Sequence, residues 1–330
     1  MFWRIAVMRL GFSIGAATAL LAGCGAPLPA SLPQDMISRI AAATVHRDRT
    51  PSWMAPRVKA QHLLYVTNAG TGSVSVYSYP AGKPSGKLTG FIKPMGDCVD
   101  QAGHVWIVDW DALSIVEFAH GGTKRLATLK NTQARNLLGC SVDPTTGDLA
   151  VTEVGPASGG AIWIYANAKG TPKKYAPGFL TAPYFVAYDG AGNLFADGLD
   201  NTNAFAFGEL PSGSSSFKSI TLNQNVTFPG GIQWDGTNVA IGDQFYQNHH
   251  QSAIYQVTVS GSTGSIVGTT PLNSTCDVLQ FGLSGSSVIA PDDCLNNAGF
   301  YGYPAGGTPT NTLIGFQYPV GAVVSTAPHH

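Results

Sequence analysis

The apolar and polar positions in residues 93–122 form a pattern that recurs through most of the chain. An apolar segment after Pro94 ends in a turn from Asp100 to Gly103, and a second apolar segment ends at Asp109. A third covers residues 113–118 and leads into a Gly-containing stretch. Short runs rich in β-branched and aromatic residues, separated by Gly- and Asp-containing turns, are typical of strands. The pattern therefore predicts three consecutive strands joined by short turns.

Four further segments repeat this pattern when the chain is aligned on its turn. The aligned turn positions are Asp100, Asp143, Asp189, Asp235 and Gly282, and successive positions are 43, 46, 46 and 47 residues apart. A period of this length is typical of β-propellers, in which each repeat forms one four-stranded blade. The five aligned segments predict five whole blades.

Two incomplete repeats flank the five whole ones. Residues 62–83 supply the second and third strands of a blade, and residues 319–325 supply a first strand with no others after it. We expect these segments to pair, because closing the ring in this way leaves no exposed sheet edge. The predicted fold is all-β: a six-bladed β-propeller of four-stranded antiparallel blades, closed by the C-terminal strand joining the N-terminal blade.

The N-terminal residues carry an export signal. Residues 1–23 begin with basic side chains and contain an apolar run, residues 10–21, that is too short to span a bilayer as a helix. The run ends in Leu21-Ala22-Gly23-Cys24, which resembles a bacterial lipobox. This resemblance implies a lipoprotein signal peptide with lipidation of Cys24, and Gly25 after it implies outer-membrane sorting. An ordinary cleaved signal with a chance cysteine is the alternative.

The remaining boundaries follow from composition. Residues 24–60 are rich in Pro and Ala and predict a lipidated tether, with Trp53 and Met54 docked on the propeller rim. Residues 61–326 are the propeller, and residues 327–330 are a tail.

Only 11% of the residues are charged, the net charge is −1 and no Lys/Arg run occurs, so we expect no nucleic-acid partner. We expect an exported monomer, at the outer membrane or facing the periplasm.

Four cysteines remain after Cys24, an even number in a chain predicted to be exported. Cys276 begins the first strand of its blade and Cys294 ends the second, so antiparallel pairing places them side by side. Cys98 and Cys140 begin the first strands of adjacent blades with opposite side-chain parity, so one can face the other. Two disulfides are predicted, Cys98–Cys140 and Cys276–Cys294. Buried free thiols are the alternative.

Polar side chains occur where the second strand of each blade ends, and we expect them to surround the central channel on one face. These positions are Asn68, Asp109, Glu153, Asp197, Asp243 and Asp292. Five like charges in a ring repel one another, so they require backbone N–H donors or a cation. In the first interpretation each side chain caps its own loop. In the second, the ring binds a cation, and oxygen ligands favour Ca²⁺.

The segments VDQAGHVWIVD, YDGAGNLFAD and WDGTNVAIGD resemble the NHL-type repeats of six-bladed propellers. The chain is also distantly similar to the SMP-30/gluconolactonase-like lactonases, which hold a divalent metal with Asn and Asp at the starts of first strands. At the matching positions here, Met95 and Gly230 replace ligands and only Asp277 is acidic. The resemblance to NHL repeats therefore implies the fold, whereas metal-dependent lactonase activity is not expected.

The other residues at the starts of the first strands, which include Tyr184, predict an apolar channel mouth with Asp277 as its one acid. Such a mouth suits a ligand site with few polar groups, and it equally suits a channel plugged by apolar side chains. His249 and His250 follow the second strand of the fifth blade on the same face, where a metal site or a general base is one interpretation. Exposed loop histidines are the other.

Residues 61–326 contain no G-x-S-x-G, H-E-x-x-H, C-x-x-C or P-loop motif. The leading prediction is therefore a membrane-anchored propeller without enzymatic activity or cofactor, which binds a protein, a glycan or a small ligand on the channel face with the acidic ring. The alternative is a Ca²⁺-dependent hydrolase or lyase that uses Asp277 with the ring and His249 or His250.

Overall fold

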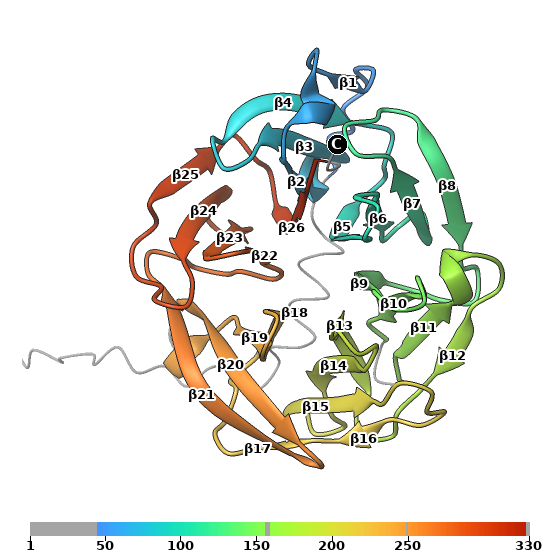
Figure 1. The fold of residues 1–330 in the computed structure, drawn as a ribbon, viewed down its shortest axis with the longest axis vertical. Helices are drawn as coiled ribbons and strands as arrows, with labels where there is room; N and C mark the ends of the chain where they lie inside the picture. Colours follow the sequence, from blue (N-terminus) through green and yellow to red (C-terminus); the bar gives the residue numbers. More distant parts are fainter. Residues whose placement is uncertain (1–44, 156–158, 249, 328–330) are drawn as a thin grey trace, which may run out of the picture.

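The computed structural model describes residues 45–155, 159–248 and 250–327. They form six sheets, antiparallel except where the short strand β17 pairs parallel with β21, arranged as the blades of a closed ring (Figure 1). The predicted six-bladed all-β propeller is confirmed. The predicted signal peptide, Cys24 and the first part of the tether lie outside the described residues, as do His249 and the last three residues.

The first three blades are formed as follows. Blade 1 contains β1 (Trp53–Met54), β2 (Leu63–Asn68), β3 (Ser73–Ser78), β4 (Lys83–Leu88) and β26 (Pro319–Ser325). Blade 2 contains β5 (Pro94–Val99), β6 (Val105–Asp109), β7 (Ser114–Phe118) and β8 (Arg125–Lys130). Blade 3 contains β9 (Leu137–Val142), β10 (Leu149–Glu153), β11 (Ala161–Tyr165) and β12 (Lys173–Tyr175).

The other three blades follow in chain order. Blade 4 contains β13 (Ala182–Tyr188), β14 (Leu194–Leu199), β15 (Phe205–Leu210) and β16 (Lys218–Ser219). Blade 5 contains β17 (Thr221–Leu222), β18 (Pro229–Trp234), β19 (Val239–Asp243), β20 (Ser252–Ser260) and β21 (Thr263–Leu272). Blade 6 contains β22 (Gly282–Ser284), β23 (Ser287–Asp292), β24 (Asn297–Gly302) and β25 (Asn311–Ile314).

The helical segments are single 3₁₀ turns: η1 (Val58–Ala60), η2 (Ala69–Thr71), η3 (Ala166–Ala168) and η4 (Tyr246–Asn248). Within the described residues, no helix has the length and apolar character needed to cross a membrane.

The C-terminal strand closes the ring as predicted. β26 pairs antiparallel with β2, with Leu64 opposite Val324 and Val66 opposite Ala322. Every residue of β26 is buried, because the strand lies between β2 and the innermost strands of its neighbours. The two ends of the propeller are therefore joined by hydrogen bonds and by apolar packing.

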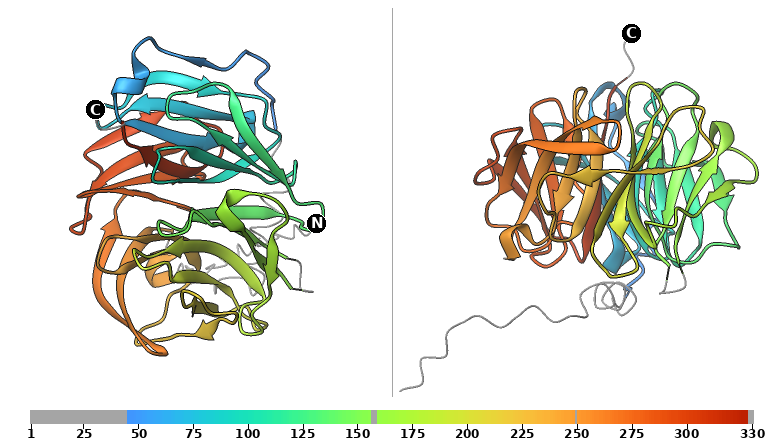
Figure 2. Two further views of the ribbon diagram at one scale, coloured as in Figure 1. Left: turned by 45° about the vertical axis from the view of Figure 1, so that its right-hand side comes forward. Right: turned by 90° about the horizontal axis from the view of Figure 1, so that it is seen from below.

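The disk has two faces, which are seen edge-on in Figure 2. On the first, here called the ring face, the innermost strands begin and the second strands end. The opposite face carries the Asp-x-x-Gly turns and is here called the turn face. β26 runs from the ring face to the turn face, so the C-terminal end of the described chain lies on the turn face.

The innermost strands of most blades begin with a β-bulge on the ring face. In blade 2, Pro94 pairs with Asp109 and Asp97 pairs with Ile107, so the inner strand carries one residue more than its partner between these pairs. Gly96 lies in this bulge, and a Cβ atom there would come within 2.4 Å of the Leu138 carbonyl oxygen. Glycine is thus required where the inner strands of adjacent blades approach closely.

The predicted tether of residues 24–60 contributes a strand to the propeller. β1, which contains Trp53 and Met54, pairs with β4 as an additional outer strand of blade 1. Upstream of it, the His46 and Asp48 backbone N–H groups donate to the carbonyl oxygens of Gly70 and Thr71, each at 2.8 Å. Both acceptors belong to η2, directly after β2 ends. Within the described residues, the chain therefore begins its contact with the propeller on the ring face.

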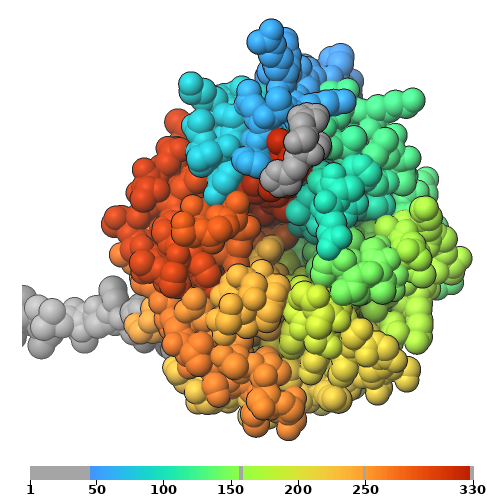
Figure 3. Space-filling model, viewed as in Figure 1, coloured from blue at the N-terminus to red at the C-terminus, as the bar shows by residue number. Residues whose placement is uncertain are grey.

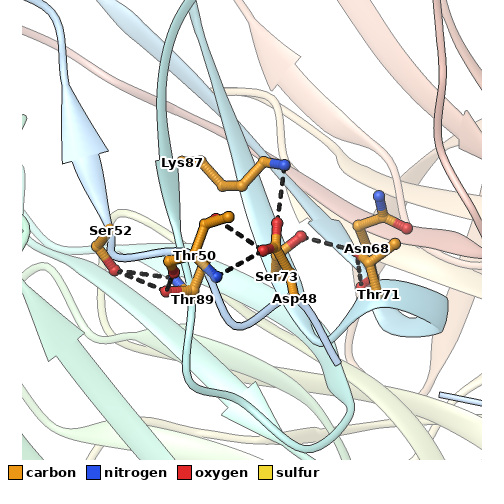
Figure 4. Close-up of polar contacts among 8 residues, drawn as sticks. All are labelled: Asp48, Thr50, Ser52, Asn68, Thr71, Ser73, Lys87 and Thr89. Carbon is orange, nitrogen blue, oxygen red and sulfur yellow. Dashed lines mark hydrogen bonds and ion pairs between the residues drawn. The ribbon is translucent and has the colours of Figure 1, made fainter. Parts of the chain in front are cut away.

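The Asp48 side chain holds this segment in place (Figure 4). Its Oδ1 atom accepts the Thr50 backbone N–H at 2.9 Å and the Thr50 hydroxyl at 2.6 Å, and its Oδ2 atom accepts from Lys87 Nζ at 2.9 Å. The Thr50 hydroxyl, the Thr50 N–H and Lys87 together lower the pKa of Asp48 to about 2. These contacts dock the described end of the tether on blade 1 before β1 begins.

Both predicted disulfides are confirmed. Cys98 of β5 is bonded to Cys140 of β9, which links blades 2 and 3 with a Cα–Cα distance of 5.7 Å. Cys276 is bonded to Cys294 within blade 6, with a Cα–Cα distance of 5.8 Å. Cys276 precedes β22 and Cys294 follows β23, so both lie just outside the strands in which they were predicted.

Candidate functional site

The six predicted ring side chains lie on the second strands of the blades, β2, β6, β10, β14, β19 and β23. The residues are Asn68, Asp109, Glu153, Asp197, Asp243 and Asp292, and none is more than 6% exposed. Their polar atoms are therefore turned into the protein, and their bonding partners decide what the ring can do.

Asp109 and Asp243 bind the chain that enters the innermost strand of their own blade. Asp109 accepts the backbone N–H groups of Ile92 and Lys93, each at 2.8 Å, just before β5 begins. Asp243 accepts those of Thr227 at 2.9 Å and Phe228 at 3.0 Å, just before β18. Each carboxylate therefore caps the loop between two blades.

Asn68, Glu153 and Asp292 make the same connection in their blades. Their side-chain oxygens accept the backbone N–H groups of Gln317 at 2.9 Å, Arg135 at 2.9 Å and Cys276 at 2.6 Å. Burial raises the pKa of Asp292, and the backbone donors oppose that shift. These backbone donors lie in the segment that leads into the innermost strand, whereas the first interpretation placed them in the side chain's own loop, and the Ca²⁺ interpretation stays a prediction.

Asp197 does not occupy the same position as the other five. In blade 4, Gly198 pairs with Pro183 as Asp109 pairs with Pro94 in blade 2, so Asp197 lies one residue earlier and has the opposite side-chain parity. It is fully buried, and its Oδ1 accepts the Phe185 backbone N–H at 3.1 Å. Its Oδ2 has no hydrogen-bond partner among the described residues. Burial therefore raises its pKa well above the usual range.

The predicted apolar mouth is packed shut. Met95, Leu138, Tyr184 and Val320 are all fully buried and belong to one apolar cluster. Tyr184 packs edge-on against Phe228, with 5.7 Å between the ring centroids. Asp277, the one acid at this level, is 2% exposed. The predicted ligand-binding side chains Tyr184 and Asp277 therefore lie below the surface of the ring face.

Of the two loop histidines, His250 is within the described residues. It is exposed, and its ring contacts Phe245 edge-on at 5.9 Å between centroids. His249 lies outside the described residues, so a metal site or a general base at these histidines stays a prediction.

A pocket of about 330 Å³ lies on the opposite face, at the turn-face end of the channel. The turn face is hollowed at its centre (Figure 3). The innermost strands of blades 1 to 5 supply the walls of the pocket, and the Cys98–Cys140 disulfide is part of them. Its aromatic side chains are Tyr188 and Trp234, and its polar side chains include Ser141, Gln233 and Asp189.

The charge in this pocket is small. Asp189 is its one ionisable carboxylate, and both of its oxygens already accept hydrogen bonds from its own turn: the backbone N–H groups of Ala191 and Asn193, each at 2.9 Å, and the Asn193 amide at 2.7 Å. Apart from Ser141 and Gln233, the other walls are Val, Ile, Ala, Pro, Gly and aromatic residues with the disulfide. A site of this size with apolar walls and few polar groups is typical of small-molecule binding.

Solved structures share this architecture. A chain from a nidogen/laminin complex superposes with a TM-score of 0.65 at 13% identity, covering 82% of this chain and all of that one. Proteins of unknown function from Desulfotomaculum acetoxidans and Bacteroides caccae give TM-scores of 0.58 at 10% and 11% identity, over 81% and 80% of this chain and 99% of theirs. These likenesses show the fold alone. No protein-family model and no curated protein matches the sequence.

The binding surface predicted from the sequence is the ring face, whereas the pocket lies on the turn face, where no site was predicted. Two signals for it were present in the repeats. Tyr188 and Trp234 each directly precede an aligned turn aspartate, so two adjacent blades carry an aromatic ring at the turn-face end of the inner strand. An aromatic residue at this repeat position is the sequence feature that could have indicated the pocket.

Proposed function

We propose that this chain is an exported, lipid-anchored binding protein whose propeller takes a small neutral ligand in the turn-face pocket. The pocket itself is the observation that supports the proposal. It has a volume of about 330 Å³, and apolar and aromatic side chains form part of its walls. On the ring face, by contrast, the ring carboxylates bind backbone N–H groups and the channel mouth is filled by apolar side chains.

The ligand class follows from the lining. Since the Asp189 oxygens are occupied by donors of their own turn, the pocket offers no free charge to compensate a charged ligand. Trp234 and Tyr188 can stack on a flat apolar face, and the amide of Gln233 and the indole N–H of Trp234 can take part in hydrogen bonds. A neutral molecule with one aromatic or sugar ring, free or as the end of a glycan, fits this environment.

The place where the tether joins the propeller bears on which way the pocket would face relative to the membrane. Residues 46–48 join the propeller at η2 on the ring face, whereas the pocket opens on the turn face. An anchor at Cys24 would therefore direct the ring face toward the membrane and leave the pocket open to the periplasm or the surroundings. This arrangement suits a receptor that collects its ligand on the side away from the bilayer.

The pocket is tested by thermal shift with neutral fragments that carry one aromatic or sugar ring, with benzoate and benzylamine as charged comparators. We expect neutral fragments to raise the Tm of the wild-type protein, the charged ones to leave it unchanged, and Trp234→Ala to abolish the response. Trp53→Ala is the matched control, because Trp53 is 46% exposed on the outer strand β1. An equal response in wild type and Trp234→Ala would refute the pocket as the site.

The anchor is tested separately by replacing Cys24 with serine. We expect the wild-type protein to partition into the membrane fraction and Cys24→Ser to appear in the soluble fraction, because the thiol that would carry the lipid is missing. The Ala26→Ser variant keeps Cys24 and controls for the introduction of a serine next to the predicted cleavage position. Membrane partitioning of Cys24→Ser would contradict the lipoprotein prediction and leave the pocket proposal untouched.

A further inference from the structure

Three potential metal ligands converge on the turn face of blade 2. Asp100 and His104 belong to the turn between β5 and β6, and Glu117 lies on β7, where it shares a row across the blade with Trp106 and Cys98. The side chains of Asp100, His104 and Glu117 are 21%, 35% and 15% exposed. The group is thus held by the sheet and still accessible from solvent.

The distances within this group suit a small metal ion. His104 Nδ1 lies 3.4 Å from Asp100 Oδ2 and 2.9 Å from Glu117 Oε1, and the three ligand atoms lie within 4.8 Å of one another. Ligands of a tetrahedral Zn²⁺ ion with bonds of about 2.0–2.2 Å are about 3.3 Å apart. The other Asp100 oxygen, Oδ1, accepts the His104 backbone N–H at 2.8 Å and so fixes the carboxylate toward the imidazole.

Blade 4 contains the same arrangement without the histidine. There, Asp189 and Glu209 take the places of Asp100 and Glu117, and Asn193 takes the place of His104. The Asn193 amide donates to Asp189 Oδ2 at 2.7 Å, so an asparagine fully satisfies the structural requirement of this turn. The imidazole in blade 2 is therefore not needed for the fold, and it adds the nitrogen ligand that blade 4 lacks.

We propose that Asp100, His104 and Glu117 bind a divalent transition-metal ion of the Zn²⁺ class. One imidazole nitrogen and two carboxylate oxygens form three of four tetrahedral positions, and the exposed side of the group leaves the fourth for water or another ligand. Ca²⁺ prefers six to eight oxygen ligands, so it fits this group less well. The charge of a divalent ion is balanced by the two carboxylates, whereas a protonated His104 would neutralise only one of them.

The metal competes with a proton for the imidazole nitrogen. Because a metal ion binds the unprotonated nitrogen, the apparent affinity is expected to be lower in more acidic solution. A simple ion pair between His104 and the two carboxylates would give no saturable Zn²⁺ binding at this group, because a proton would occupy the place of the ion.

The test compares the wild-type protein with His104→Asn and with Asn193→His, using Zn²⁺ in isothermal titration and Co²⁺ as a visible absorption probe. His104→Asn reproduces the side chains of blade 4 and is expected to fold normally, and to weaken Zn²⁺ binding by at least about tenfold. Asn193→His supplies blade 4 with the missing nitrogen ligand. This variant is expected to bind one additional ion.

The variants also separate this site from histidines elsewhere in the chain. Zn²⁺ affinity and stoichiometry that are the same in the wild-type protein and in His104→Asn would overturn the proposal, since the ion would then bind another group. Loss of binding in His104→Asn that Glu117→Gln does not reproduce would also overturn it, because the carboxylate would not be a ligand.

Discussion

A chain that ends at Tyr318 is expected to lose its cooperative thermal unfolding transition, because it lacks β26. All seven residues of this strand are buried, and it forms the innermost strand of blade 1. Without it, β2 exposes a hydrogen-bonding edge to the channel, and the apolar contacts of β26 with its neighbouring inner strands are lost. Near-UV circular dichroism and resistance to proteolysis report the expected loss of fixed packing.

The matched control is a chain that ends at Thr326, directly after the strand. It removes the tail but keeps the pairing of β26 with β2, so its Tm is expected to stay within about 2 °C of the wild type. A chain ending at Tyr318 that unfolded cooperatively at the wild-type temperature would show that the ring does not depend on its closing strand. Addition of residues 319–326 as a separate peptide is expected to restore part of the lost structure, because the strand pairs through its backbone.

The blades could be predicted because each repeat carries its own local signals. The turn at Asp100 and Gly103 and the apolar strand ending at Asp109 fix the hairpin of blade 2 without reference to the remainder of the chain. The pairing of Cys98 with Cys140 followed from side-chain parity along two such strands. The hairpins and the disulfide, which depend on single strands and the turns beside them, could therefore be predicted from the sequence.

A one-residue difference in spacing, visible in the sequence, separates Asp197 from Asp109. Asp197 follows its turn residue Asp189 by eight positions, whereas Asp109 follows Asp100 by nine, and the bulges of the two blades have the same length. This difference turns the Asp197 side chain to the other side of its strand, because side chains alternate along a strand. Its partner is consequently Phe185 in the middle of the inner strand, instead of the chain that leads into it.

The turn-face pocket and the blade 2 cluster depend on still longer-range geometry. Strands from five blades meet at the pocket, and its volume is set by how far their ends converge. Glu117 belongs to the third strand of its blade and becomes a neighbour of Asp100 only through the register of two successive strand pairs. The sequence shows the residue types at these positions, whereas the distances follow only from the assembled ring.

The second large effect is expected at Asp97, on the inner strand β5. This side chain is fully buried, and neither carboxylate oxygen has a hydrogen-bond partner among the described residues. The neighbouring blade packs directly against it, since a Cβ atom on Gly321 would lie 2.7 Å from Asp97 Oδ1. Burial raises the pKa of Asp97 well above its ordinary value of 3.8. The folded protein therefore favours the neutral acid.

Asp97→Asn is expected to raise the Tm at pH 8 by at least about 3 °C, since each unit of pKa shift corresponds to about 1.4 kcal/mol. The wild-type stability is fully present below pH 3.8, where both states hold the proton, and it declines as the pH rises toward the folded pKa. The amide keeps the size of the neutral acid and does not ionise. The advantage of the variant should therefore grow from near zero at pH 4 to its maximum above the folded pKa.

Asp48→Asn provides the control of opposite sign. The pKa of Asp48 is lowered to about 2, so its carboxylate contributes stability above pH 3.8 that is lost as the pH falls toward 2. Because Asp48 lies near the surface, its replacement should lower stability at pH 8 by only about 1 kcal/mol or less.

A lower Tm for Asp97→Asn at pH 8 would mean that Asp97 is charged in the folded state and has a cationic partner. The pKa of Asp197 is also raised by burial, so Asp97→Asn should reduce the pH dependence of stability without abolishing it.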